Sequence, residues 1–147
     1  MNTLNHALWG TTIGRTVGMP VEGAIIASIP DLLTVPIFGY YLFKKKLKPN
    51  QSPESLRVGY EILHNWFFAG ALSIILGVIS KSLLILSLGY LWHVVEDAFL
   101  HKNMASRFLW PFWNGKIQLV SANGNKWIQV LDLFAIIGVN IYLFKVL

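Results

Sequence analysis

A run of apolar residues at positions 62–80 contains no aspartate, glutamate, lysine or arginine. As a helix that rises about 1.5 Å per residue, this run is long enough to cross the roughly 30 Å hydrocarbon core of a bilayer. Charged residues make up only 13% of the 147-residue chain, about half the share usual in soluble domains. So few charges cannot cover a soluble domain of this size. The composition therefore predicts an integral membrane protein with a single transmembrane domain over residues 1–147.

Further apolar segments accompany this run, and together they predict an all-α helical bundle of four to five helices. They cover residues 4–17, 21–43, 82–100 and 127–147. The first is short and carries Arg15, so it fits an interfacial helix as well as a span. In the second, Pro30-Asp31 and Pro36 interrupt the apolar run. Because proline removes a backbone donor, we expect a broken or re-entrant segment at Pro30-Asp31, where Asp31 could also cap the next helix.

Basic residues are concentrated in two stretches between the apolar segments. The stretch 44–57 contains five of them and the stretch 101–126 contains four, whereas Lys81 alone marks the turn between two adjacent spans. The positive-inside rule therefore places both basic loops in the cytoplasm and Lys81 on the opposite side. The net charge of +5 is explained by this membrane topology, so we expect no nucleic-acid partner.

Polar residues recur at helical spacing within the apolar segments. His93, Asp97 and His101 follow one another at intervals of four residues, which places them on one face of a helix. His64 lies 17 residues before Lys81 and Asp97 lies 16 residues after it. Residues at these distances from a turn lie level on adjacent antiparallel helices. His64 and Asp97 should therefore meet near the cytoplasmic leaflet.

Two more polar residues can reach the same place. His6 does so if the N-terminus is cytoplasmic, and Asp31 does so if the prolines shorten its segment. Ionisable groups inside a membrane are costly, so they indicate a functional site, and imidazole beside carboxylate suits a divalent metal. The chain has no cysteine, which excludes thiolate ligands. We predict zinc, with manganese or iron as alternatives, at a site whose metal ligands are His64, His93, Asp97 and Asp31 and whose catalytic residues are His6, Asp31 and His101.

The order of short motifs along residues 5–115 resembles the predicted membrane-bound metal-dependent hydrolases of bacteria. That family has an N-terminal histidine, a Pro-Asp dipeptide, a histidine that opens a transmembrane helix, a His-x-x-x-Asp helix and a Leu-x-Pro-Phe turn. The resemblance implies His6, Asp31, His64, His93 and Asp97 as site residues, and it implies the bacterial inner (plasma) membrane. The matching segments are Asn5-His6-Ala7-Leu8-Trp9-Gly10, Ile29-Pro30-Asp31-Leu32-Leu33, Leu63-His64-Asn65, Trp92-His93-x-x-Glu96-Asp97 and Leu109-Trp110-Pro111-Phe112.

The function expected from these residues is metal-dependent hydrolysis of a lipid or phosphoester substrate, with membrane lipid as the natural partner. Three alternatives remain open at this point. His93 and Asp97 could be a structural hydrogen-bonded pair in a non-enzymatic membrane scaffold. His64 and His93 could ligate haem, or the polar residues could form an ion pathway. The spacing assigns no role to Glu96 or Asp132 and no oligomeric state.

Overall fold

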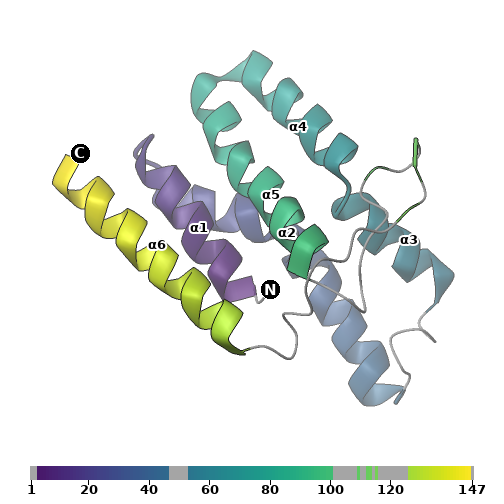
Figure 1. Ribbon diagram of the computed structural model, residues 1–147. Helices are drawn as coiled ribbons and strands as arrows, with labels where there is room; N and C mark the ends of the chain where they lie inside the picture. Colours follow the sequence, from purple (N-terminus) through teal and green to yellow (C-terminus); the bar gives the residue numbers. More distant parts are fainter. Residues whose placement is uncertain are drawn as a thin grey trace.

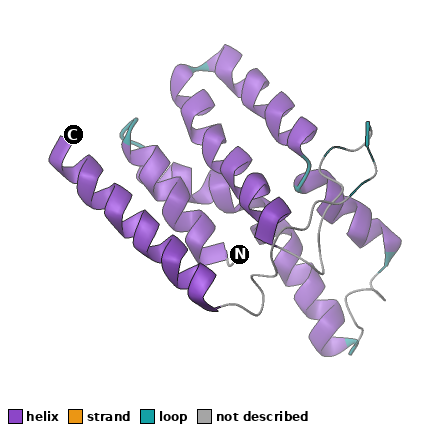
Figure 2. Ribbon diagram, in the orientation of Figure 1, coloured by secondary structure: helices purple, strands orange, loops and turns teal. Residues whose placement is uncertain are grey.

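The computed structural model describes residues 3–46, 53–100, 109, 112, 113, 115 and 126–146, and its regular elements are all helices (Figures 1 and 2). This confirms the all-α class within the described part of the chain. Helix α3 covers residues 54–63, where we expected the end of the basic loop and the start of the apolar span, so the described residues contain six α-helices rather than four to five. The elements are α1 (Thr3–Arg15), α2 (Pro20–Gly39), the π-helical turn η1 (Tyr40–Lys44), α3 (Glu54–Leu63), α4 (Trp66–Ile79), α5 (Lys81–Leu100) and α6 (Lys126–Val146).

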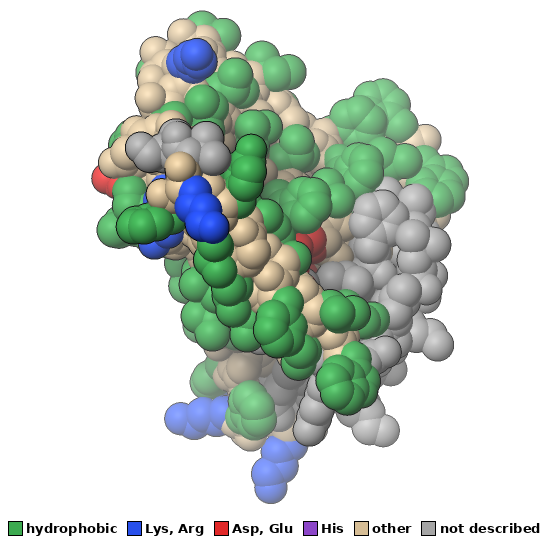
Figure 3. Space-filling view, turned by 60° about the vertical axis from the view of Figure 1, so that its left-hand side comes forward, with side chains coloured by type: hydrophobic (Ala, Val, Ile, Leu, Met, Phe, Trp, Pro, Cys, Tyr) green, Lys and Arg blue, Asp and Glu red, His purple; other side chains and the backbone are tan. Residues whose placement is uncertain are grey.

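Two of these helices are long and apolar enough to cross a membrane, namely Pro20–Gly39 and Trp127–Lys145. A third span is present if α3 and α4, which meet at a 50° bend, are counted together. Large apolar side chains point outward from the bundle, such as Val78 on α4 and Phe144 on α6, whose side chains are 84% and 87% exposed. Hydrophobic side chains cover much of the face in Figure 3, with lysine and arginine toward its upper and lower ends. Such a surface suits a lipid environment.

The expected break at Pro30-Asp31 is wrong, because α2 continues through both Pro30 and Pro36. A helix tolerates proline where neighbouring groups satisfy the backbone around it. His93 of α5 hydrogen-bonds through Nδ1 to the Ala27 carbonyl at 2.7 Å, and the Thr34 hydroxyl donates to the Pro30 carbonyl at 2.7 Å. The prolines therefore lie within an intact helix, which near Pro30 has one contact from α5 and one from its own Thr34.

A break occurs instead at His64-Asn65, inside the run that we expected to be one continuous span. Asn65 caps α4, because its side-chain oxygen accepts a hydrogen bond from the Phe68 amide at 3.1 Å. The Tyr90 hydroxyl of α5 donates to the Leu63 carbonyl at 2.6 Å, which satisfies the end of α3. This break turns the buried His64 into the interior of the bundle.

The helices that carry the polar residues cross at small side chains. A Cβ atom on Gly10 of α1 would lie 2.2 Å from the Gly23 carbonyl oxygen of α2, and a Cβ on Gly89 of α5 would lie 3.2 Å from the Ala27 side chain. Gly10 therefore needs glycine for close approach of the backbones, and Gly89 leaves room for the Ala27 side chain. This crossing brings α1, α2 and α5 together around the polar interior (Figure 1).

Candidate metal centre

Four buried side chains from three helices converge at the centre of the bundle. Asp31 comes from α2, His64 from the C-terminal end of α3, and His93 and Asp97 from one face of α5. One nitrogen or oxygen atom of each residue lies within 4.8 Å of the corresponding atoms of the others. The expected convergence is thus observed for these four residues, and the group could hold a metal ion. The His64 Nε2 atom lies 3.4 Å from Asp97 Oδ2, in agreement with the expected level placement.

Both histidines present the same ring nitrogen to this centre. The Nδ1 atom of His64 lies 3.0 Å from the Tyr60 carbonyl oxygen, and the Nδ1 atom of His93 lies 2.7 Å from the Ala27 carbonyl oxygen. A carbonyl oxygen only accepts hydrogen bonds, so each Nδ1 carries the proton that it donates. In the neutral imidazole, Nε2 is then left with a lone pair. Hydrogen bonding of the outer nitrogen to a carbonyl is the usual way to orient a metal-ligating histidine.

The spacing of the inner atoms fits a small cation. The two Nε2 atoms are 3.3 Å apart, and each lies 3.4 Å from Asp97 Oδ2. Four ligands at about 2.0–2.1 Å from zinc would lie about 3.3–3.4 Å from one another at the corners of a tetrahedron. Asp31 Oδ1 lies slightly farther out, 3.9 Å from His64 Nε2 and 3.8 Å from His93 Nε2. Four acceptor atoms this close repel one another unless a cation or an added proton lies among them.

His6 occupies a second layer, outside the four-residue group. Its Nε2 lies 3.2 Å from Asp97 Oδ1, on the side of the carboxylate opposite the oxygen that faces the other histidines. Its ring stacks on that of His93 with centroids 3.7 Å apart. His6 therefore contacts two of the proposed ligands without entering the group itself. The structure thus places His6 where it can orient Asp97 or hold a proton.

Glu96 is the site residue that the sequence did not reveal. Its side chain should point about 100° away from that of Asp97 on the helix, which suggested a different partner. In the structure Glu96 is buried, and its Oε2 lies 3.2 Å from His6 Nδ1, although the two are not aligned for a hydrogen bond. Because α1 crosses α5 at this point, His6 lies between Glu96 and Asp97. The spacing of residues along α5 alone could not predict that a histidine of α1 lies between Glu96 and Asp97.

Two further polar residues considered in the sequence, His101 and Asp132, are not part of the four-residue group. His101 lies outside the described residues. Asp132 of α6 accepts hydrogen bonds from Asn5 Nδ2 at 2.6 Å and from Trp9 Nε1 at 2.9 Å, so it joins α6 to α1. Haem ligation does not fit this geometry, because the 3.3 Å between the Nε2 atoms of His64 and His93 leaves no room for a macrocycle between them.

The four buried residues could therefore hold a metal ion, and His6 and Glu96 lie beside them. Its ligands come from helices that are far apart in sequence, and only the packing of the bundle brings them together. Comparisons with protein families, with curated proteins and with solved structures found no match to this chain.

Proposed function

We propose that this protein is a membrane-embedded metal-dependent hydrolase of the bacterial inner membrane. In this proposal Asp31, His64, His93 and Asp97 are the ligands, and zinc is the metal, with manganese or iron as alternatives. The observation that supports it is the meeting of two Nε2 lone pairs and two carboxylate oxygens within 4.8 Å in a buried interior. Two carboxylates balance the charge of one divalent cation. They also leave the low-dielectric interior without an unpaired charge.

A divalent metal would supply Lewis acidity and make water a better nucleophile near neutral pH. The second layer provides the proton chemistry that hydrolysis also needs. His6 lies between Asp97 Oδ1 and Glu96 Oε2, at 3.2 Å from each. It can therefore hold a proton on either ring nitrogen, with a carboxylate beside each to stabilise the charged form. The ring stacking with His93 keeps His6 in this position.

The substrate class follows from the surroundings of the site. The bundle contains membrane-spanning candidates, and its outer surface is apolar, so a lipid or a phosphoester amphiphile can approach from the bilayer. Basic residues follow α2 in the stretch 44–57, and a cytoplasmic location of this stretch would attract anionic lipids. A site on the same side of the membrane would then meet substrates at the headgroup level.

Metal analysis of detergent-purified protein tests the ligand assignment. We expect about one zinc ion per chain in the wild type and loss of that zinc in His93→Ala, because one imidazole ligand is removed. Asp132→Asn is the matched control, since it removes a carboxylate that accepts hydrogen bonds from Asn5 and Trp9 and lies outside the four-residue group. Glu96→Gln should keep its zinc, because Glu96 lies outside the four-residue group.

Activity separates a hydrolase from a metal-stabilised scaffold. Nitrophenyl esters, bis-nitrophenyl phosphate and phospholipid vesicles cover the ester and phosphoester classes. On the cleaved probe we expect Glu96→Gln to lose about 10²-fold in rate while its zinc content is unchanged. A wild type that binds zinc but cleaves none of these probes would refute the hydrolase. A wild type that binds no zinc, manganese or iron would favour a scaffold in which an added proton joins the two histidines.

A further inference from the structure

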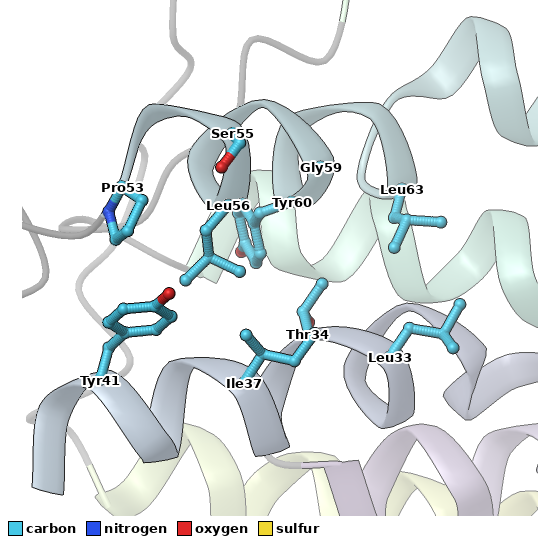
Figure 4. Close-up of a pocket in the computed structure, with 10 residues that line it drawn as sticks. All are labelled: Leu33, Thr34, Ile37, Tyr41, Pro53, Ser55, Leu56, Gly59, Tyr60 and Leu63. Atoms are coloured by element: carbon cyan, nitrogen blue, oxygen red, sulfur yellow. The ribbon is translucent and has the colours of Figure 1, made fainter. Parts of the chain in front are cut away.

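A groove of about 340 Å³ runs between α2 with η1 on one side and α3 on the other. Figure 4 shows Tyr41 and Pro53 at one end of the groove and Leu33 and Leu63 at the other, with Tyr60 between them. The volume is within the range of small-molecule sites. Its lining is mainly apolar, and the Tyr41 hydroxyl lies at the end marked by Pro53 (Figure 4).

The groove adjoins the candidate metal centre. The Tyr60 side chain lines the groove, and its ring stacks on that of His64 with centroids 3.9 Å apart. Two other lining residues are close in sequence to the proposed ligands, since Leu63 precedes His64 and Thr34 lies one helical turn after Asp31. The Tyr60 ring is therefore the direct link between the groove and the metal centre.

Gly59 keeps the middle of the groove open. A Cβ atom built on this residue would meet nothing within 4 Å, so no protein contact requires glycine there. Gly10 and Gly23 differ, because their Cβ atoms would collide with backbone. Glycine inside a helix costs roughly 0.5–1 kcal/mol relative to alanine. The open space at Gly59 therefore marks a place where a larger side chain would narrow the groove without disturbing the fold.

Charge distinguishes the two ends of the groove. Lys44 ends the helical segment that contributes Tyr41, Lys45 and Lys46 follow it, and all three are exposed. At the opposite end, Leu33 is 53% exposed on the outer side of the membrane-spanning candidate α2. Cations and the Tyr41 hydroxyl thus lie at one end and apolar surface at the other. A phospholipid has the same order of groups, with an anionic phosphate, then ester groups, then acyl chains.

We propose that the groove binds one anionic glycerophospholipid in its bilayer orientation. The phosphate lies toward Lys44–Lys46, the ester region lies beside Tyr60, and an acyl chain continues past Leu33 into the membrane. As a statement about substrate the proposal rests on the hydrolase function, because it presents a lipid ester to the metal centre. As a statement about binding it stands independently, since the groove residues are not metal ligands.

Photo-crosslinking in vesicles tests the binding. The probe is phosphatidylglycerol with a diazirine in one acyl chain, present at low fraction in phosphatidylcholine vesicles that contain the purified protein. We expect labelled peptides from α2 and α3, and we expect Gly59→Leu to reduce this labelling roughly tenfold because its side chain occupies the groove. Gly59→Ala should retain the labelling, since it adds only a methyl group.

Gly70→Leu on α4 is the matched control. Its Cβ also meets nothing within 4 Å, but Gly70 does not line the groove, so labelling should be unchanged. A phosphatidylcholine probe with the same diazirine should label α2 and α3 several-fold less. Equal labelling by the two probes, or equal labelling of Gly59→Leu and the wild type, would overturn the proposal. Labelling that depends on Gly59 in a protein without hydrolytic activity would instead refute the hydrolase and leave the lipid site intact.

Discussion

Thr3 holds one of the proposed ligands from outside the centre. Its hydroxyl donates to Asp31 Oδ2 at 2.7 Å, which leaves Oδ1 directed at His64 and His93. Groups that orient a ligand in this way contribute about 10- to 100-fold to metal affinity. We therefore expect Thr3→Val, which keeps the shape and removes the hydroxyl, to weaken zinc binding by about this factor in competition with a chelating dye.

Thr11→Val provides the comparison, because the Thr11 hydroxyl bonds only to the Ala7 carbonyl of its own helix at 2.9 Å. Its zinc affinity should equal that of the wild type. The same loss in both variants would mean that α1 responds to any lost hydroxyl, and the orienting role of Thr3 would be incorrect.

At this scale the sequence predicted contacts within an element better than contacts between elements. His93 and Asp97 lie four residues apart, so helical geometry alone placed them together. The placement of His64 beside them was predicted by counting residues from the Lys81 turn along two antiparallel helices. The pairing of Thr3 with Asp31 and that of His6 with Glu96 depend on where α1 crosses its neighbours. The spacing of polar residues along one helix does not predict where two helices cross.

At the scale of the helices, the glycine crossing of α1 and α2 sets the position of His6. A methyl group on Gly10 would lie 2.2 Å from the Gly23 carbonyl oxygen. This methyl group is fixed to the backbone of α1 and the oxygen belongs to the backbone of α2, so the clash can be relieved only if one of the two helices shifts. We expect Gly10→Ala to lower the free energy of unfolding by roughly 1–3 kcal/mol, as overpacking does. Thermal unfolding in detergent measures this change.

Gly70→Ala tests whether the effect belongs to the crossing. Gly70 lies on α4 with open space around its Cβ, so alanine there should leave the melting temperature unchanged or raise it. Equal destabilisation by the two substitutions would show that general helix packing, and not the approach of α1 to α2, limits stability.

The location of the helix break shows why propensity was an incomplete guide. Proline predicted a break at Pro30, yet α2 continues through it and packs against α1 and α5 there. The actual break at His64-Asn65 has a recognisable signal in the N-capping Asn65. Asn65 stands within a long apolar run, and the length and hydrophobicity of that run favoured a single continuous helix. We therefore interpreted the run as one span.

At the scale of the whole molecule, the described helices that border the two basic stretches, α3 and α5, both carry residues of the candidate centre at their C-terminal ends. The α4–α5 hairpin turns at Ser80-Lys81, and His64 and Asp97 lie at its other end. The stretch 44–57 connects η1 to α3, which ends at His64, and the stretch 101–126 follows α5. The positive-inside rule therefore assigns the side of the membrane nearest the candidate centre to the cytoplasm.

Cysteine labelling measures this sidedness directly, because the natural chain contains no cysteine. We expect Ser52→Cys and Ser121→Cys to react with a membrane-impermeant maleimide only in inside-out vesicles, since each lies in a basic stretch. Ser82→Cys, beside the hairpin turn, should react only in right-side-out vesicles. Reaction of all three from one side would overturn the topology. Reaction of Ser52→Cys and Ser121→Cys only in right-side-out vesicles would in addition place the basic stretches outside the cytoplasm, and it would remove the reason for expecting an anionic lipid at Lys44–Lys46.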